Sequence, residues 1–99
     1  MTSSVYFILY ESDPAFIKIG FSDTPQKRME ALSVWCPIPM RLLATLSGWR
    51  TLEAELHARF EHLRHRGEWF RAEPELLDFV ERVKSGDVVS ASMVGQLCT

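Results

Sequence analysis

Several side chains in this sequence have types and spacings suited to chemistry on a charged substrate. Glu53 and His57 are four residues apart, so on a helix they share one face. They flank an apolar stripe rather than belong to it, and a polar pair at the edge of a core is where a cleft can form. Arg28 offers a planar fork for phosphate oxygens. Lys18 can donate to a phosphate or, if desolvated, act as a base.

Lys18 and Tyr6 must share a sheet face if they are to act together. Residues 5–10 are β-branched, aromatic or apolar, which predicts a strand, and residues 16–21 alternate with the period of a second strand. The short polar link between them favours an antiparallel hairpin. If the apolar positions of the second strand point to the core, Lys18 points to the opposite face. Tyr6 joins it there when its own neighbours face the core.

Helix-breaking residues and apolar stripes at helical spacing predict the remaining elements. Thr24-Pro25 opens a helix that ends before Pro37, and a third strand is expected over residues 40–46. A second helix begins at Thr51, carries the stripe Leu52, Leu56, Phe60 and Leu63, and is expected to end near Arg66-Gly67. A third helix spans residues 73–85. The order β-β-α-β-α-α predicts an α+β fold, with a small three-stranded antiparallel sheet packed by about three helices.

Length and composition predict one small domain. The chain has 99 residues, of which 46% are hydrophobic and 24% charged, as in ordinary globular proteins. We expect a domain over residues 1–85 and a flexible tail over residues 86–99. No apolar run approaches the roughly 20 residues of a membrane span, and the N-terminus lacks a secretory pattern. Cys36 and Cys98 are far apart and do not suggest a disulfide framework, so we expect a cytoplasmic protein without membrane contact.

An ordered set of motifs resembles a known nuclease superfamily. The set consists of Val5-Tyr6-Phe7-Ile8, Ile17-Lys18-Ile19-Gly20, Arg28, Glu53-Ala54-Glu55-Leu56-His57-Ala58-Arg59-Phe60 and Gly67-Glu68-Trp69-Phe70. Together these residues resemble the GIY-YIG nuclease superfamily, and more closely its branch of phage and bacterial DNA-binding domains with a K-I-G second strand and a G-E-W-F ending. The likeness covers roughly residues 5–83.

The resemblance implies hydrolysis of DNA phosphodiester bonds with one divalent metal, Mg²⁺ or Mn²⁺. It places Tyr6 near the attacking water and Arg28 where it would neutralise the phosphate in the transition state. Glu53 would bind the metal, with Glu55 as the neighbouring candidate if the motif is shifted by two residues. His57 lies one helical turn beyond Glu53, where this branch also has a histidine. One carboxylate suffices for Mg²⁺, which keeps most of its waters.

Two departures from the superfamily pattern keep a second hypothesis open. Lys18 stands where the second motif usually has a tyrosine, and the chain contains no asparagine, which some members use late in the sequence. These departures favour a catalytically degenerate DNA-binding module that uses the same groove. A protein-interaction domain that kept only the fold, with the tail around Val88 to Leu97 as its contact surface, is a third alternative.

Charge and metal-ligand spacing restrict the partners. The formal net charge is −2, so DNA binding has to use a local patch or a metal, not the overall charge. Five Arg and four Glu lie between residues 50 and 71, which makes only a weak basic patch. A partner protein that supplies DNA specificity is compatible with so short a chain. His57, His62 and His65 do not share one helical face, and there is no CxxC motif, so structural zinc is not expected.

Overall fold

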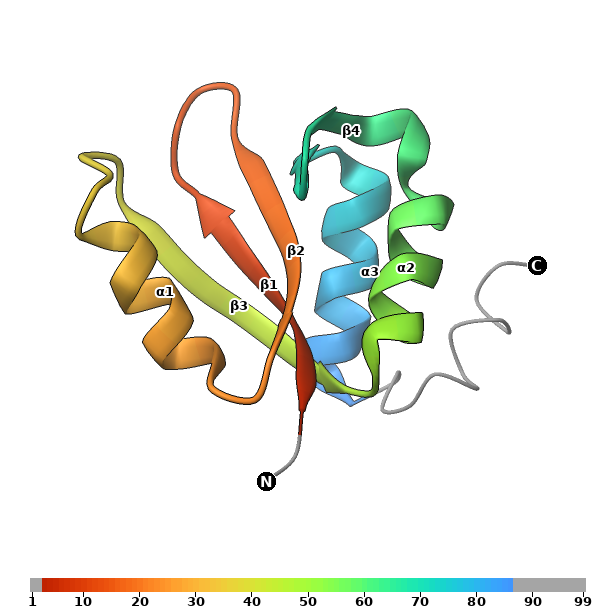
Figure 1. The fold of residues 1–99 in the computed structure, drawn as a ribbon. Coiled ribbons are helices and arrows are strands. Elements are labelled where there is room, and N and C mark those ends of the chain that lie inside the picture. The colour runs from red at the N-terminus through yellow and green to blue at the C-terminus, as the bar shows by residue number, and fades with distance from the viewer. Residues whose placement is uncertain (1–2, 87–99) are drawn as a thin grey trace.

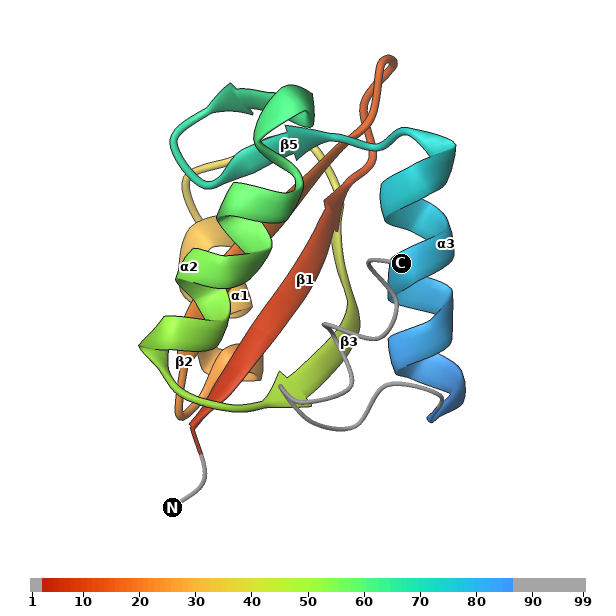
Figure 2. The same ribbon diagram turned by 90° about the vertical axis from the view of Figure 1, so that its right-hand side faces the viewer.

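Within residues 3–86, three helices pack on the two faces of a single antiparallel sheet. The structure, a computed structural model, describes residues 3–86. The elements are β1 (Ser4–Tyr10), β2 (Phe16–Ser22), α1 (Pro25–Ser33), β3 (Met40–Ser47), α2 (Arg50–Arg59), the 3₁₀ turn η1 (Glu61–Leu63), β4 (Arg64–Arg66), β5 (Trp69–Arg71) and α3 (Pro74–Ser85). In Figure 1, α1 lies on one side of the sheet and α2 and α3 on the other, and the turned view of Figure 2 shows the same separation. The predicted α+β class is confirmed.

The sheet has five strands in the order β3-β1-β2-β5-β4, so the prediction of three strands was too low. The missed strands, β4 and β5, have three residues each, which is too short to show a period of two. The second helix was predicted to reach residue 66, but α2 ends at Arg59. Phe60 and Leu63 remain buried because the chain continues through a 3₁₀ turn that preserves their inward spacing. Gly67 then adopts φ +57° and turns the chain into β5.

The hairpin register places Tyr6 and Lys18 on the same face of the sheet, as predicted. Tyr6 lies opposite Gly20, and Lys18 lies opposite Ile8, so Tyr6 and Lys18 are diagonal neighbours. The alternate strand positions enter the core together with α2 and α3; this core comprises Val5, Phe7, Ile17, Ile19, Leu46, Leu52, Leu56, Phe60, Leu63, Phe70, Leu76, Phe79, Val80 and Val83. The face that carries Tyr6 and Lys18 is therefore the one that α1 covers.

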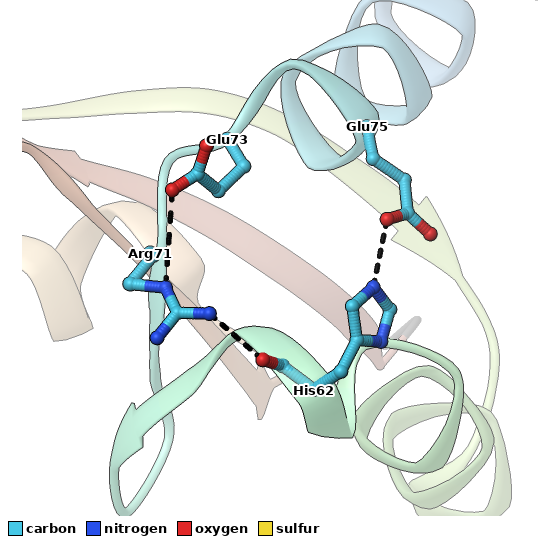
Figure 3. Close-up of polar contacts among 4 residues, drawn as sticks. All are labelled: His62, Arg71, Glu73 and Glu75. Atoms are coloured by element: carbon cyan, nitrogen blue, oxygen red, sulfur yellow. Dashed lines mark hydrogen bonds and ion pairs between the residues drawn. The ribbon is translucent and has the colours of Figure 1, made fainter.

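A polar clamp fixes the β4–β5 hairpin to the start of α3. The Arg71 guanidinium on β5 donates a hydrogen bond of 2.9 Å to the carbonyl oxygen of His62 on η1 and lies 3.9 Å from the carboxylate of Glu73. His62 Nε2 lies 2.7 Å from Glu75 Oε2 in the first turn of α3 (Figure 3). These contacts are exposed and individually weak, but together they connect η1, β5 and the start of α3.

Two expectations from the sequence concern residues that the structure does not describe. The predicted tail, apart from Gly86, lies outside the described residues, as does Cys98. Between residues 3 and 86, none of the helices has the length and apolar character required to cross a bilayer.

Candidate functional site

A pocket of about 200 Å³ opens beside the second half of β2. It is lined by Phe21, Arg28, Arg50, Glu53 and Glu68, and we call it the carboxylate pocket. Its residues come from β2, α1, α2 and the β4–β5 turn. They can meet because β5 pairs only with Phe16–Lys18, the first half of β2. The second half of that strand edge is left to side chains that reach it from elements on both faces of the sheet.

Tyr6 packs against β2 at a glycine. A Cβ atom added to Gly20 would lie 2.3 Å from both Cζ and Oη of Tyr6, so the phenol occupies the space that any other residue would fill. The Tyr6 side chain is buried. Burial, followed by the negative charges of Glu68 and Glu53, raises the pKa of Tyr6 to about 12, although the positive charge of Arg28 acts to lower it. Tyr6 is therefore a neutral phenol near pH 7, able to donate a hydrogen bond but not to act as a ready base.

Two carboxylates share the carboxylate pocket. The pKa of Glu53 is raised above its ordinary value, first by burial and then by the negative charge of Glu68. The positive charges of Arg50 and Lys18 act in the opposite direction, as does His57 when it is protonated. Glu53 therefore sits where an added cation would be favourable. Glu55, the alternative candidate, is exposed and does not line the pocket.

Lys18 holds the second carboxylate in place. Its Nζ lies 3.2 Å from Glu68 Oε1, and its side chain is only 15% exposed. The same ammonium lies 5.3 Å from the centroid of the Trp69 ring, within the range of a cation–π contact. Lys18 therefore fixes the β4–β5 turn against β2 and places positive charge beside the pocket.

His57 hydrogen-bonds to the backbone of β2 and does not line the carboxylate pocket. Its Nε2 lies 2.8 Å from the carbonyl oxygen of Ile19, and its ring packs 5.1 Å from that of Phe70. The Ile19 N–H donates to the Glu68 carbonyl at 3.0 Å, where the β2–β5 pairing ends. His57 thus supplies the next donor along the strand edge, which requires the proton on Nε2 and leaves Nδ1 for any proton transfer.

The structure brings most of the predicted site residues together. Arg28 and Glu53 line one pocket, Tyr6 lies within electrostatic range of both, and Lys18 reaches the pocket through Glu68. His57 lies beside the pocket and is engaged by β2.

Sequence reasoning missed Gly20, Arg50 and Glu68 as site residues. The spacing of three between Arg50 and Glu53 on one helix is a signal that could have identified Arg50. Glu68 gave no such signal, because its position depends on a hairpin that the sequence pattern did not reveal.

The donors of the carboxylate pocket fit a hard divalent cation. Mg²⁺ prefers oxygen ligands, uses one or two protein carboxylates and keeps several waters. Within residues 3–86 no group of three or more His, Cys, Asp or Glu side chains gathers as a metal site. A metal here would therefore be held by Glu53 and Glu68 and completed by water or a phosphate.

Comparison with known protein families gives a match over most of the chain. The family model described as "T5orf172 domain" matches residues 3–84. The chain belongs to the T5orf172 domain family. The assignment to the GIY-YIG superfamily from motif resemblance was therefore wrong, because the family that matches is a different one and no GIY-YIG model does. No curated protein and no solved structure matches the chain.

The T5orf172 match supports a protein that acts on DNA. The family is a phage-associated domain of DNA-binding and nuclease-like character, which is consistent with the partner expected from the sequence. Since the chain belongs to a different family, the motif resemblance does not support individual roles for the predicted site residues Tyr6, Lys18, Arg28, Glu53 and His57. Support for these roles comes from the geometry of the carboxylate pocket.

Proposed function

We propose that this T5orf172 domain hydrolyses phosphodiester bonds in DNA with the help of a divalent metal, Mg²⁺ or Mn²⁺. The observation that carries the proposal is the convergence of three groups from three elements. The Arg28 guanidinium of α1 and the Glu53 carboxylate of α2 line one pocket, and the Tyr6 phenol of β1 lies within electrostatic range of both. A cationic fork and a metal-binding oxygen serve a phosphate undergoing attack by water, and a neutral hydroxyl can add a hydrogen bond to the water or the phosphate.

Each residue has a separate part in this proposal. Arg28 and Arg50 bind the phosphate oxygens and balance the charge that develops on them. Glu53 and Glu68 hold the metal, which when bound supplies an activated water and stabilises the leaving oxygen. Tyr6 donates a hydrogen bond to the water or to a phosphate oxygen, because its raised pKa keeps the proton in place.

In this proposal Lys18 and His57 mainly hold the two carboxylates in place. Lys18 keeps Glu68 in the pocket through their 3.2 Å ion pair and adds a donor close to the phosphate. His57 ties α2 to β2 through Ile19, one turn from Glu53, so it sets where the carboxylate points. Its Nδ1 is the only atom through which it can move a proton while that bond persists.

A DNA-binding module without chemistry is the second candidate. The observation in its favour is that Lys18 already balances the charge of Glu68. With Arg28 and Arg50 in the same pocket, the site can hold a phosphate without a metal.

Incubation with supercoiled plasmid distinguishes the two functions. The hydrolase nicks the plasmid with Mg²⁺ or Mn²⁺ and not with EDTA, and both Arg28→Ala and Glu53→Ala lower the rate by about 100-fold or more. Matched controls are Arg41→Ala and Glu55→Ala, which change exposed residues outside the carboxylate pocket and keep the wild-type rate. A salt-sensitive gel shift without nicking supports the binding module. Full nicking by both pocket variants contradicts the proposed site.

A further inference from the structure

A second cavity lies on the face of the sheet that carries Tyr6 and Lys18. It has a volume of about 230 Å³ and is lined by Tyr10, Phe16, His65, Arg66 and Trp69; we call it the aromatic cavity. Phe16 and Lys18 alternate along β2, and Trp69 of β5 lies opposite Lys18 in the sheet. The aromatic cavity therefore lies beside the first half of β2, whereas the carboxylate pocket lies beside the second half. None of its residues has a part in the proposed hydrolysis.

The rings around the aromatic cavity are arranged to receive another ring. Phe16 and His65 lie 4.5 Å apart between centroids with an interplanar angle of 31°. Tyr10 and Trp69 lie 5.3 Å apart at 79°, edge to face. All four rings remain partly or fully exposed, so their surfaces are not used up by the core. A flat apolar ligand would gain stacking contacts here that water cannot supply.

The charge of the residues that line the aromatic cavity determines which flat ligands it favours. Among the described residues that line the aromatic cavity none is acidic, and Arg66 contributes a permanent positive charge. Such a lining repels a methylated ammonium or another cationic ligand, which aromatic cages otherwise favour. It attracts a ring that is attached to an anion.

The two sites are linked by direct contacts. Lys18 Nζ lies over the Trp69 ring at 5.3 Å and pairs with Glu68, which lines the carboxylate pocket. Trp69 in turn lines the aromatic cavity. A polymer in which anionic groups alternate with planar rings can therefore place one of each in the two neighbouring sites.

We propose that the aromatic cavity binds one unstacked nucleobase of a DNA strand whose phosphate occupies the carboxylate pocket. The inference rests on the proposed action on DNA and adds a substrate class to it. The preferred substrate is DNA with an unpaired base, in a single strand, a frayed end or a flipped-out nucleotide. Stacking recognises any base by its face, so this site selects DNA structure rather than sequence.

Binding of short labelled single strands tests the base site. Fluorescence anisotropy is measured in EDTA, so that no strand is cut, with a set of strands in which one abasic residue is moved along the sequence. Loss of one stacked base should weaken binding by about 5- to 100-fold when the abasic residue falls at the cavity. His65→Ala should weaken binding of the intact strand and remove the dependence on abasic position. His65 is exposed, so this change spares the core, and Arg41→Ala is the control on another exposed residue.

The outcomes separate this inference from the proposed function. Arg28→Ala should weaken binding of every strand by a similar factor and keep the dependence on abasic position. If wild-type protein binds and nicks DNA but no abasic position changes its affinity, the base site is wrong and the hydrolase proposal stands. An abasic effect that persists in His65→Ala places the stacking elsewhere and also overturns the inference. Absence of binding to every strand while nicking with Mg²⁺ persists overturns the base site and leaves the hydrolase proposal standing, whereas absence of both binding and nicking overturns both proposals.

Discussion

At the scale of single residues, the position of the Tyr6 phenol depends on a neighbour without a side chain. The ring and hydroxyl occupy the volume next to Gly20, with only 2.3 Å from Oη to where a Cβ would be. The sequence predicted that Tyr6 and Lys18 share a face, because alternation along the two strands sets it. It could not predict the role of Gly20, because that role arises from which residue lies opposite Tyr6 in the hairpin.

Gly20→Ala should therefore damage the site more than its size suggests. The added methyl forces the phenol to move, so we expect a loss of about 1–3 kcal/mol in the free energy of unfolding and a loss of nicking at least as large as that of Tyr6→Phe. Urea unfolding and the plasmid assay measure the two effects. Wild-type stability and activity in Gly20→Ala would show that Tyr6 is not held as described.

Glu53 should stabilise the fold more as a neutral group than as a charged one. Burial and Glu68 raise its pKa in the folded protein above the unfolded value of about 4.3. The folded state therefore binds the proton more tightly, and stability falls as pH rises from the unfolded pKa through the raised one. Glu53→Gln removes this loss, so its melting temperature should exceed that of wild type at pH 7 and converge with it at pH 3.

Activity of Glu53→Gln should change in the opposite direction, because an amide is a poor ligand for Mg²⁺ compared with a carboxylate. Greater stability combined with lost nicking is the pattern expected of a residue kept for function. Thermal unfolding across pH, with Glu55→Gln as the exposed control on the same helix, makes the comparison. A lower melting temperature for Glu53→Gln at pH 7 would contradict the environment assigned to Glu53.

At the scale of elements, the open half of β2 explains why a site forms at this edge. The long strands and α3 could be predicted from the sequence because each carries several periods of its pattern. β4 and β5 could not, because three residues and a turn at Gly67 carry almost no pattern. Because β4 and β5 carry so little sequence pattern, the position of Glu68 between them could not be predicted. For the same reason, α2 was predicted to extend to residue 66.

His57 tests how α2 is attached to that edge. Its bond to the Ile19 carbonyl is the side-chain continuation of the β2–β5 pairing. His57→Ala leaves that carbonyl without its donor and should cost about 1–3 kcal/mol of stability. His57→Gln keeps an N–H donor, so a positioning role predicts that it recovers stability and most of the nicking rate. Recovery of stability without activity would show instead that His57 transfers a proton.

At the scale of the whole molecule, the formal net charge is −2, yet three cations gather around one pocket. The DNA binding that we propose would therefore depend on the local arrangement of Arg28, Arg50 and Lys18 and not on a broad basic surface. The aromatic cavity beside them adds contacts that do not depend on charge. This combination favours substrates with an accessible base and phosphate over a smooth duplex.

The proposed hydrolysis requires the carboxylate pocket to hold a divalent metal beside Arg28. Crystals of the protein soaked in MnCl₂ and measured for anomalous scattering test it most directly, because Mn²⁺ takes the oxygen ligands of Mg²⁺ and can be located by its signal. We expect one strong peak within coordination distance of Glu53, and no peak there in Glu53→Gln crystals. An empty carboxylate pocket in wild-type crystals, or a peak bound only by residues outside it, would contradict metal-dependent hydrolysis at this pocket.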